Sequence, residues 1–294
     1  MRILSVGEVL CDVFAHSEHI GGAPLNFAFH AACLGHEVEM VSAVGRDPRG
    51  KAILEFAREA RVGTRFLQSL GDYPTGVVSV HFTDQGQPVY EIERPAAYQH
   101  VNFTEADCAV LKQWDPQGIY FGTLFHTNRE ALQTTERILA TCDSAARFYD
   151  VNLRTGAYTP ELVRKLAQMA TILKLNNEEA PEVAGLLGTP FSSFENFARG
   201  AAIRYGYQAV CITRGAEGCS ILWNGRFLEC PGYPAAVMDT VGAGDAFSAA
   251  FLHGWMSGWS PEDTCDFANR VGALIAGRSG GTPQWSEVEL PLRR

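Results

Sequence analysis

The sequence lacks the features of a protein that works on nucleic acids or in membranes. Its net charge is −9, and it contains no basic run. An acidic chain without a basic patch is poorly suited to a nucleic-acid surface. No apolar run approaches membrane-spanning length, and the chain enters a strand-like segment at residues 3–6 without a signal-peptide pattern. We therefore expect a cytoplasmic protein with no nucleic-acid or membrane partner.

Motifs for a zinc site or a redox pair are also missing. The eight cysteines are scattered without any Cys-x-x-Cys spacing, and the eight histidines form no His-x-x-x-His pair. Several cysteines lie inside apolar runs, as at residues 210–212, where cysteine behaves as a small hydrophobic residue. This usage fits a reducing compartment and predicts neither a metal centre nor a redox pair.

What the sequence does contain is a regular alternation of strand-like and helix-like segments. Strands are expected at 2–6 and 37–44, and then near 117–121, 146–151, 171–175 and 208–213; helices are expected near 104–112, 128–141, 160–169, 193–205 and 259–277. This alternation predicts a parallel sheet with helices on both faces, whose ligands bind beyond the carboxyl ends of the strands. The 294 residues show no internal repeat or linker, so we expect a single domain over 1–294.

Two stretches have a different, antiparallel character. Residues 75–95 place apolar residues on both sides of a polar turn at 83–87, which predicts a β-hairpin. A second hairpin is expected for 219–223 and 226–230, because Asn224-Gly225 between them is a strong turn dipeptide.

A glycine-rich turn at residues 242–244 leads directly into an apolar helix. Gly242, Ala243 and Gly244 precede Asp245, and apolar residues then recur with the rhythm of one helix face. The first amides of a helix have no internal partner and carry partial positive charge, so this turn is a natural seat for a phosphate. Asp245 would repel an anion unless it accepts a proton from an attacking hydroxyl. The alternative is that Asp245 only caps the helix.

The run Asp239-Thr240-x-Gly242-Ala243-Gly244-Asp245 resembles the signature of the ribokinase-like sugar kinases, the PfkB family. Gly21-Gly22-Ala23-Pro24-x-Asn26 is similar to the sugar-binding signature of that family, and most similar to its fructokinase branch. The resemblance covers nearly the whole chain. It implies a three-layer α/β sandwich with a central, mostly parallel sheet and a small β lid. It also implies phosphoryl transfer from ATP to a sugar.

The resemblance assigns sugar contacts to two stretches. The first comprises Asp12, Gly21, Gly22 and Asn26, although a turn and a helix start would explain the same residues. The second is Asp150-Val151-Asn152-Leu153-Arg154, which resembles the Asp-x-Asn-x-Arg of the fructokinase branch. Alternating residues of an extended segment point one way, so we expect Asp150, Asn152 and Arg154 to face one cleft. A salt-bridged strand end is the alternative.

Nucleotide and cation contacts are likewise implied by the resemblance. Asn176 and Glu179 match the family's Asn-x-x-Glu, which organises hydrated Mg²⁺ on the nucleotide; a helix-capping turn is the alternative. Residues 276–285, with Asp239 and Val241, would offer oxygens to a monovalent cation such as K⁺, although an ordinary C-terminal loop fits equally well. The further residues assigned to the nucleotide are Thr213, Gly215, Gly218 and Asn269.

The lid is expected from residues 12–20 and 75–98, with a plain surface hairpin as the alternative. Only eight residues, 13–20, separate Asp12 from Gly21, so we expect that half of the lid to be truncated. The truncation leaves open whether the chain forms the lid-mediated homodimer of the family.

The predicted function is transfer of the γ-phosphoryl group of ATP to a hydroxyl of fructose or a related monosaccharide. Asp245 is the expected base, and the amides of residues 242–244 are the expected anion hole. A nucleoside or a sugar phosphate is an alternative acceptor. The sugar phosphate stays an alternative because the chain has cationic side chains that could bind its phosphate, at Arg94, Arg129 and Arg154. A sugar-binding regulator without catalysis is a third possibility, against which the intact Gly242, Gly244 and Asp245 weigh.

Overall fold

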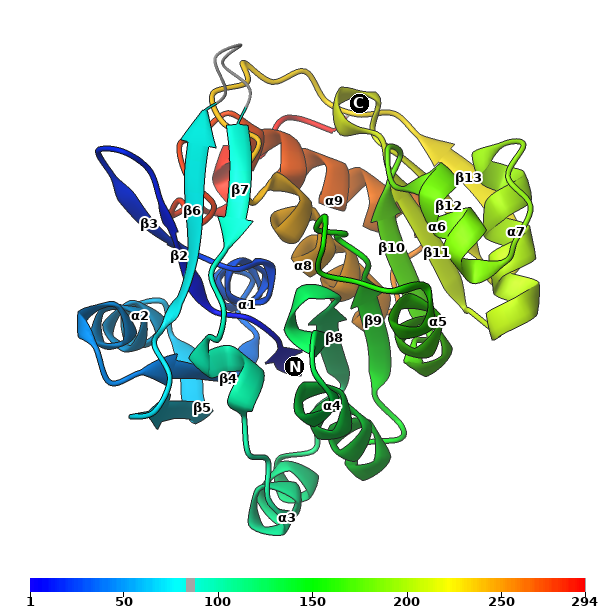
Figure 1. Cartoon of the computed structure of the whole chain (residues 1–294). Helices are drawn as coiled ribbons and strands as arrows, with labels where there is room; N and C mark the ends of the chain where they lie inside the picture. The colour runs from blue at the N-terminus through cyan, green and yellow to red at the C-terminus, as the bar shows by residue number, and fades with distance from the viewer. Residues whose placement is uncertain (83–87, 294) are drawn as a thin grey trace.

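The computed structural model describes residues 1–82 and 88–293, and its centre is a nine-stranded sheet (Figure 1). Seven neighbouring strands pair in parallel, and two further strands extend one edge in antiparallel fashion. The order across the sheet is β13 (Arg226–Cys230), β12 (Cys219–Trp223), β11 (Ala209–Thr213), β10 (Ile172–Asn176), β9 (Ala146–Asp150), β8 (Gly118–Gly122), β1 (Arg2–Val6), β4 (Glu37–Gly45) and β5 (Val62–Leu70). The expected mostly parallel sheet is confirmed.

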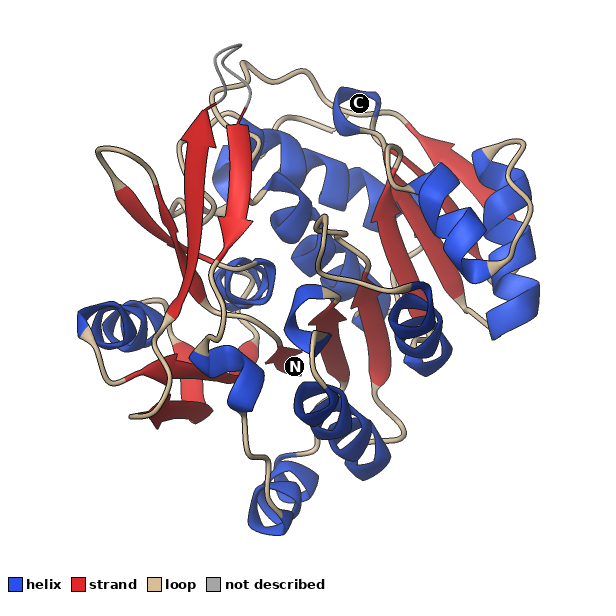
Figure 2. Cartoon of the chain, in the orientation of Figure 1, coloured by secondary structure: helices blue, strands red, loops and turns tan. Residues whose placement is uncertain are grey.

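Helices cover both faces of this sheet (Figure 2). One face carries α1 (Ala23–Cys33), α2 (Pro48–Glu59), α8 (Ala243–Met256) and α9 (Pro261–Ala276). The other carries α3 (Glu105–Trp114), α4 (Arg129–Thr141), α5 (Pro160–Met169), α6 (Ala180–Leu187) and α7 (Phe194–Tyr205). Strand residues alternate between the two cores: Ile172 packs with the first helix layer and Leu173 with the second. The predicted three-layer α/β architecture is therefore correct.

A four-stranded second sheet stands beside the main one (Figure 1). Its order is β3 (Glu18–Gly21), β2 (Leu10–Val13), β6 (Gly76–Phe82) and β7 (Pro88–Ile92), with β2 and β6 parallel. Leu10 and Val78 of this sheet form a small core with Leu124 and Ala157, which follow β8 and β9. The small sheet thus packs over the carboxyl ends of central strands. The segment expected to be truncated forms a hairpin of two four-residue strands, and the turn expected at 83–87 lies outside the described residues.

Several elements differ from the sequence expectations. Strand β5 and helix α6 were not predicted, and β9 ends at Asp150 rather than at residue 151. Helix α2 begins directly after Asp47, whose side chain accepts hydrogen bonds from the amides of Gly50 (2.8 Å) and Thr75 (2.8 Å). Asp47 therefore both caps the helix and anchors the strand that enters the small sheet. Within the described part of the chain, no helix combines the length and apolarity that a membrane crossing requires.

Candidate active site

The N-terminus of α8 is shaped by a glycine that no other residue could replace without rearrangement. Gly242 has φ +77°, and a Cβ at this position would lie 2.3 Å from the carbonyl oxygen of Gly281. No side chain caps this helix end. The Ala243 amide donates to the Thr240 carbonyl at 3.3 Å, and the other first-turn amides leave this helix end open to a ligand. The macrodipole favours an anion there.

Asp245 lies in the first turn of α8 and faces a polar neighbour rather than the apolar core. Its Oδ2 accepts a hydrogen bond of 2.9 Å from Nδ2 of Asn26 on α1. Since no side chain caps the helix, the alternative that Asp245 is merely a cap does not hold. Burial, and secondarily the charge of Asp150, raise the pKa of Asp245 to about 6, against the lowering effects of Asn26, Lys174 and Arg154. A carboxylate with this pKa is ionised at neutral pH and basic enough to take a proton.

The residues assigned to the sugar lie in the N-terminal third of the chain, and one of them, Asn26, contacts the Asp245 carboxylate. A Cβ on Gly21 would lie 2.8 Å from Oδ2 of Asp12, and one on Gly22 would lie 2.6 Å from the carbonyl oxygen of Glu8. Both glycines therefore permit close packing, and Gly22 also has φ +107°. Asn26 Oδ1 is buried without a hydrogen-bond partner among the described residues, so it retains acceptor capacity.

Two residues of this region were missed in the sequence analysis. Glu8, directly after β1, is only 4 % exposed, and its Oε2 has no hydrogen-bond partner in the described part of the chain. Burial raises the pKa of Glu8 to about 7, and the charge of Asp245 adds to the rise while Arg154 opposes it. The hydroxyl of Tyr98 is also buried and unpartnered there. Glu8 was detectable, because it is an acidic residue at the end of a central strand.

The segment after β9 departs from the expected extended geometry. β9 ends at Asp150, and Asn152 has φ +39°, so the assumption that 150, 152 and 154 alternate on one extended strand was wrong. Asp150 is 1 % exposed and pairs with Lys174 of β10, with Nζ to carboxylate distances of 3.0 and 3.1 Å. Arg154, in contrast, is exposed and acts electrostatically on Glu8, Asp12 and Asp245.

Asn176 and Glu179 form a tight reciprocal turn at the end of β10. The Glu179 amide donates to Oδ1 of Asn176 (2.8 Å), and the Asn176 amide donates to Oε2 of Glu179 (2.9 Å). This is the capping geometry named above as the alternative. Oε1 of Glu179 also accepts from the amide of Leu153 at 2.7 Å, which ties the loop after β9 to the turn. Each carboxylate oxygen has a second lone pair that can accept a bond from water on a metal ion.

A cavity of about 410 Å³ opens beside the N-terminus of α8. Its walls include Ala243 and Gly244 from the glycine-rich turn and Phe247 from the next turn of α8. The five residues assigned to the nucleotide all line this cavity: Asn176, Thr213, Gly215, Gly218 and Asn269. Its size and its mixture of apolar wall and a few polar groups are typical of a small-molecule site.

The residues assigned to a monovalent cation lie beside the same turn. Asp239 accepts hydrogen bonds from the amides of Val241 (3.0 Å) and Gly280 (3.0 Å), and so joins the C-terminal loop to the glycine-rich turn. Gly281 in that loop also contacts Asn26: a Cβ on it would lie 2.9 Å from the Asn26 Nδ2. The loop thus touches both the anion-binding turn and the sugar-side asparagine.

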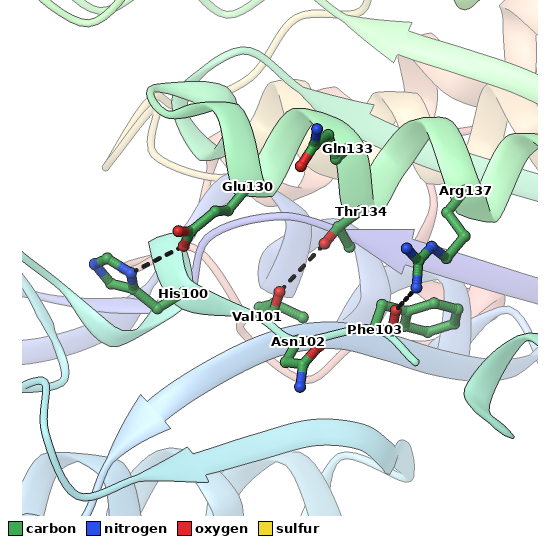
Figure 3. Close-up of a pocket in the computed structure, with 8 residues that line it drawn as sticks. All are labelled: His100, Val101, Asn102, Phe103, Glu130, Gln133, Thr134 and Arg137. Atoms are coloured by element: carbon green, nitrogen blue, oxygen red, sulfur yellow. Dashed lines mark hydrogen bonds and ion pairs between the residues drawn. The ribbon is translucent and has the colours of Figure 1, made fainter. Parts of the chain in front are cut away.

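A second cavity, of about 290 Å³, lies between residues 100–103 and α4 (Figure 3). Its polar groups bind one another: His100 pairs with Glu130 (3.3 Å), Thr134 donates to the Val101 carbonyl (3.2 Å), and Arg137 donates to the Phe103 carbonyl (2.7 Å). None of its lining residues was predicted to be functional. The contacts fasten a connecting segment to a helix.

Three cysteines meet where the sequence predicted no cluster. The Sγ atoms of Cys219, Cys230 and Cys265 lie within 4.8 Å of one another, and all three residues are buried. The spacing rule missed them because it detects neighbours in sequence, whereas the pairing of β12 with β13 and the packing of α9 join distant positions.

Comparison with known proteins places this geometry in context. The model of the pfkB family of carbohydrate kinases matches residues 3–287. A fructokinase from Escherichia coli is 25% identical, over 100% of this chain and 97% of its own. A 2-dehydro-3-deoxygluconokinase from Thermoproteus tenax is 25% identical, over 90% and 81%. The crystal structure of a fructokinase with bound ATP from Xylella fastidiosa superposes with a TM-score of 0.85 at 22% identity, over 96% and 94%, and shares the fold.

Proposed function

Since this chain belongs to the pfkB family of carbohydrate kinases, we propose that it transfers the γ-phosphoryl group of ATP to a hydroxyl of fructose or a related monosaccharide. The observation that carries the proposal is Asp245. It stands 2.9 Å from Asn26 at a helix end that no side chain caps. Gly244, immediately before it, lines the cavity of about 410 Å³. A base between a sugar site and a phosphate site is the arrangement that phosphoryl transfer requires.

In the proposed reaction, Asp245 accepts the proton of the acceptor hydroxyl as that oxygen attacks the γ-phosphorus. The bond from phosphorus to the β,γ-bridging oxygen breaks, and ADP leaves with the electron pair. Backbone amides of Gly242, Ala243 and Gly244 stabilise the charge on the transferring oxygens, because they are fixed in the first turn of a helix. Asn26 orients the Asp245 carboxylate through its amide.

Asp12, Gly21, Gly22 and Asn26 are proposed to hold the sugar. The unpartnered Oδ1 of Asn26 and the Asp12 carboxylate supply acceptors for sugar hydroxyls, and the two glycines keep the backbone close. Asn152 and Arg154 would border the sugar, while Asp150 would act from beneath. The nucleotide would occupy the cavity lined by Asn176, Thr213, Gly215, Gly218 and Asn269.

Mg²⁺ is proposed as the cation on the nucleotide, where it would offset phosphate charge. The donor set fits, since Glu179 and Asn176 both offer side-chain oxygens and a hydrated Mg²⁺ needs few direct protein ligands. Asp239, Val241 and residues 276–285 are proposed to lie around a monovalent cation such as K⁺. A K⁺ titration of turnover against Na⁺ and Li⁺ at constant ionic strength tests the second cation.

A sugar acid or sugar phosphate is the second candidate acceptor, and one observation favours it. Arg154 is exposed and lies close enough to influence Glu8, Asp12 and Asp245, but it forms no ion pair with any residue that the structure describes. A guanidinium in that position suits a carboxylate or phosphate on the substrate. The similarity to a 2-dehydro-3-deoxygluconokinase makes the sugar acid the form to test first.

A panel of acceptors with ATP and Mg²⁺, followed by ADP release, decides between these functions. Fructose, other ketohexoses, a 2-dehydro-3-deoxy sugar acid, fructose 6-phosphate and a nucleoside should each be offered at equal concentration. We expect the highest kcat/KM for fructose. Preference for the sugar acid, lost in Arg154→Ala but not in Arg129→Ala, would favour the second candidate. Sugar binding without ADP release for any acceptor would support a regulator instead.

A homodimer through the small sheet is also proposed. Its outer strands, β3 and β7, each have one described neighbour in the sheet, and a second copy can pair with a free edge. Light scattering of the full chain measures the mass. A monomer at millimolar protein concentration would contradict this part of the proposal.

A further inference from the structure

A buried polar cluster lies directly beneath the first turn of α8. It consists of Asp150, Lys174, Ser248 and Tyr120, and we refer to it as the buried quartet. Lys174 pairs with both carboxylate oxygens of Asp150, and the Tyr120 hydroxyl donates to Asp150 Oδ2 at 3.2 Å. The Ser248 hydroxyl lies 3.1 Å from the same oxygen. These side chains come from three strands and one helix, so their meeting is a product of the fold.

The buried quartet contacts the anion-binding turn at Gly244. The Ser248 hydroxyl is 2.9 Å from the Gly244 carbonyl, so one side chain connects that residue to Asp150. A Cβ on Gly244 would lie 3.4 Å from Nζ of Lys174, which places the ammonium group immediately behind the turn. Gly244 also lines the nucleotide cavity, so its outer side faces the ligand and its inner side faces the quartet.

A buried ion pair is a poor way to stabilise a fold. Removing two charges from water costs several kcal/mol per ion, and a well-packed apolar pair of similar volume is often at least as stable. Lys174 and Asp150 are 7 % and 1 % exposed, so this cost applies to both. Their position against the turn that holds Asp245 therefore suggests a role in the reaction.

We propose that Lys174 and Asp150 are positioning residues, which hold the α8 turn through Ser248 and act on the charge of Asp245 in opposite directions. This inference rests on the proposed role of Asp245 as the base. Asp150 makes ionisation of Asp245 harder and Lys174 makes it easier, so the two oppose each other at the base, with Asp150 having the larger effect. The other charged or titratable groups around Asp245 are Arg154, Glu8 and Tyr120.

The pH profile of kcat/KM tests the electrostatic half of the proposal, which is the effect of Asp150 and Lys174 on the charge of Asp245. Asp150→Asn leaves Lys174 uncompensated, so the acid limb should move to lower pH by about one unit, close to tenfold in kcat/KM on that limb. The double variant Asp150→Asn/Lys174→Met removes the uncompensated charge and should move the limb back toward the wild-type position. Ionisation of the ATP phosphates is the same in every protein and cancels from the comparison. A limb that does not move in Asp150→Asn, or does not move back in the double variant, overturns this half.

Ser248→Ala tests the positioning half of the proposal, in which the ion pair holds the α8 turn through Ser248. This variant changes no charge. It should lower kcat about threefold to tenfold, the loss of about one hydrogen bond, without moving the acid limb. Unchanged kcat would overturn this half. Circular dichroism and ATP binding establish that each variant is folded. If the acceptor panel releases ADP with wild type while these variants behave as wild type, the inference fails and the kinase function stands.

The three-cysteine cluster carries a second, independent inference. Cys219 and Cys230 lie opposite each other in the β12–β13 pair, and Cys265 reaches them from α9. One turn after Cys265, the Asn269 amide donates to the carbonyls of Cys230 (3.4 Å) and Pro231 (3.2 Å). Asn269 also lines the nucleotide cavity, so the cluster is linked to the cavity wall.

Burial decides which ligand three thiols can take here. The hydrogen bond with Cys219 and burial raise the pKa of Cys230 to about 12, against the lowering effect of the hydrogen bond with Cys265, so this thiol is protonated and neutral. Hydrogen bonds with Cys219 and Cys230, and burial, likewise raise the pKa of Cys265. Three thiolates around a divalent cation leave a net negative charge, which is costly in an apolar interior. Trivalent arsenic bound by three cysteine sulfurs leaves no net charge. As(OH)₃ and three S–H groups give three As–S bonds and three water molecules, without oxidation or reduction.

We infer that Cys219, Cys230 and Cys265 together form a site for a trivalent thiophilic ion, for which arsenite is the probe. Under reducing conditions, the intact protein should gain the mass of one arsenic atom less three hydrogens. The gain should be lost in Cys219→Ala, Cys230→Ala and Cys265→Ala, and kept in Cys142→Ala, a buried cysteine outside the cluster.

X-ray absorption of the arsenite-treated wild type gives a test that needs no variant. It should show three sulfur neighbours around arsenic. Fewer sulfurs, no mass gain, or a gain that persists in all three cluster variants overturns the site. The KM for ATP should rise severalfold on arsenite binding, because α9 and the segment that follows β13 contribute to the cavity wall. An unchanged KM would overturn the link to the cavity.

Discussion

Polar groups line two regions of the molecule, and the two regions use them differently. Between residues 100–103 and α4, Thr134 and Arg137 each bind a backbone carbonyl, and His100 binds Glu130 (Figure 3). Around Asp245, by contrast, Glu8 Oε2 and Asn26 Oδ1 are buried with no partner in the described part of the chain. Satisfied groups stabilise a fold, whereas unsatisfied ones cost free energy until a ligand pairs with them. The difference supports the second region as the proposed substrate site.

The largest expected effect comes from the base itself. Asp245→Asn keeps the shape and the bond geometry to Asn26 but removes the proton acceptor, so kcat should fall about 10²–10⁴-fold with little change in ATP affinity. Asp72→Asn, an exposed carboxyl with no described contact to either region, is the control. Steady-state ADP release measures both. Near-wild-type turnover in Asp245→Asn would refute the assigned role.

The next effect comes from the turn that shapes the anion site. Gly242→Ala places a Cβ 2.3 Å from the Gly281 carbonyl, so the first turn of α8 must shift, and kcat/KM should fall about 10²-fold. Gly258→Ala provides the matched control: its φ is also positive (+70°), but nothing lies within 4 Å of the new Cβ. Gly258→Ala should lower the free energy of unfolding by about 1 kcal/mol because of backbone strain, but it should leave kcat/KM unchanged. Equal kinetics for the two variants would contradict this account.

The pH dependence of turnover follows from the environment of Asp245. Its pKa is raised to about 6, chiefly by burial, so kcat/KM should fall about tenfold per pH unit below that value. If the base were an ordinary exposed aspartate, this fall in kcat/KM would begin about two pH units lower. The profile is measured with the best acceptor of the panel. A flat profile between pH 4 and pH 6 would exclude Asp245 as the titrating base.

Glu8 should show stability and activity moving in opposite directions. The folded pKa of about 7 lies above the ordinary value of 4.5, so the folded state holds the proton more tightly, and the ionised carboxylate destabilises the fold at high pH. Glu8→Gln should therefore stabilise by about 1–3 kcal/mol at pH 8, and the difference should vanish below pH 4.5. The KM for the sugar should rise severalfold. Urea unfolding at both pH values and sugar kinetics measure this; a destabilised variant at pH 8 would contradict it.

Thr134→Val should give the smallest effect and the reverse pattern. It removes a satisfied hydrogen bond to the Val101 carbonyl, so the free energy of unfolding should fall by about 1 kcal/mol while kcat/KM stays unchanged. Thermal unfolding measures the change in stability, and ADP release measures kcat/KM. A kinetic loss larger than threefold would mean that the region around α4 is not separate from the site.

Most of the fold was predictable because local pattern and global architecture agree. The hairpin at 219–230 matches β12 and β13 residue for residue, since Asn224-Gly225 determines its turn. Strand β5 was not recognised, because its half-buried positions mix arginine, glutamine and threonine with apolar residues. Helix α6 is only eight residues long, too short for a clear period.

The site was predictable where a motif is contiguous and less so where the fold assembles it. The glycine-rich turn and the nucleotide-cavity residues are local motifs at strand ends. Lys174, in contrast, lies 24 positions from Asp150 and 74 from Ser248 in sequence. Its role could be recognised only once the fold places β10 beside β9 and beneath α8. The extended segment assumed for residues 150–154 failed because Asn152 adopts a positive φ, which Asn tolerates and no periodicity reveals.

The contact of Gly281 with both Gly242 and Asn26 has a consequence for biogenesis. A ribosome delivers Asn26 long before Gly281, so a nascent chain can form much of its sheet before the proposed catalytic pocket is closed. Chains that stall or are clipped before residue 281 would lack this contact. Competence to phosphorylate would thus require that synthesis has passed residue 281.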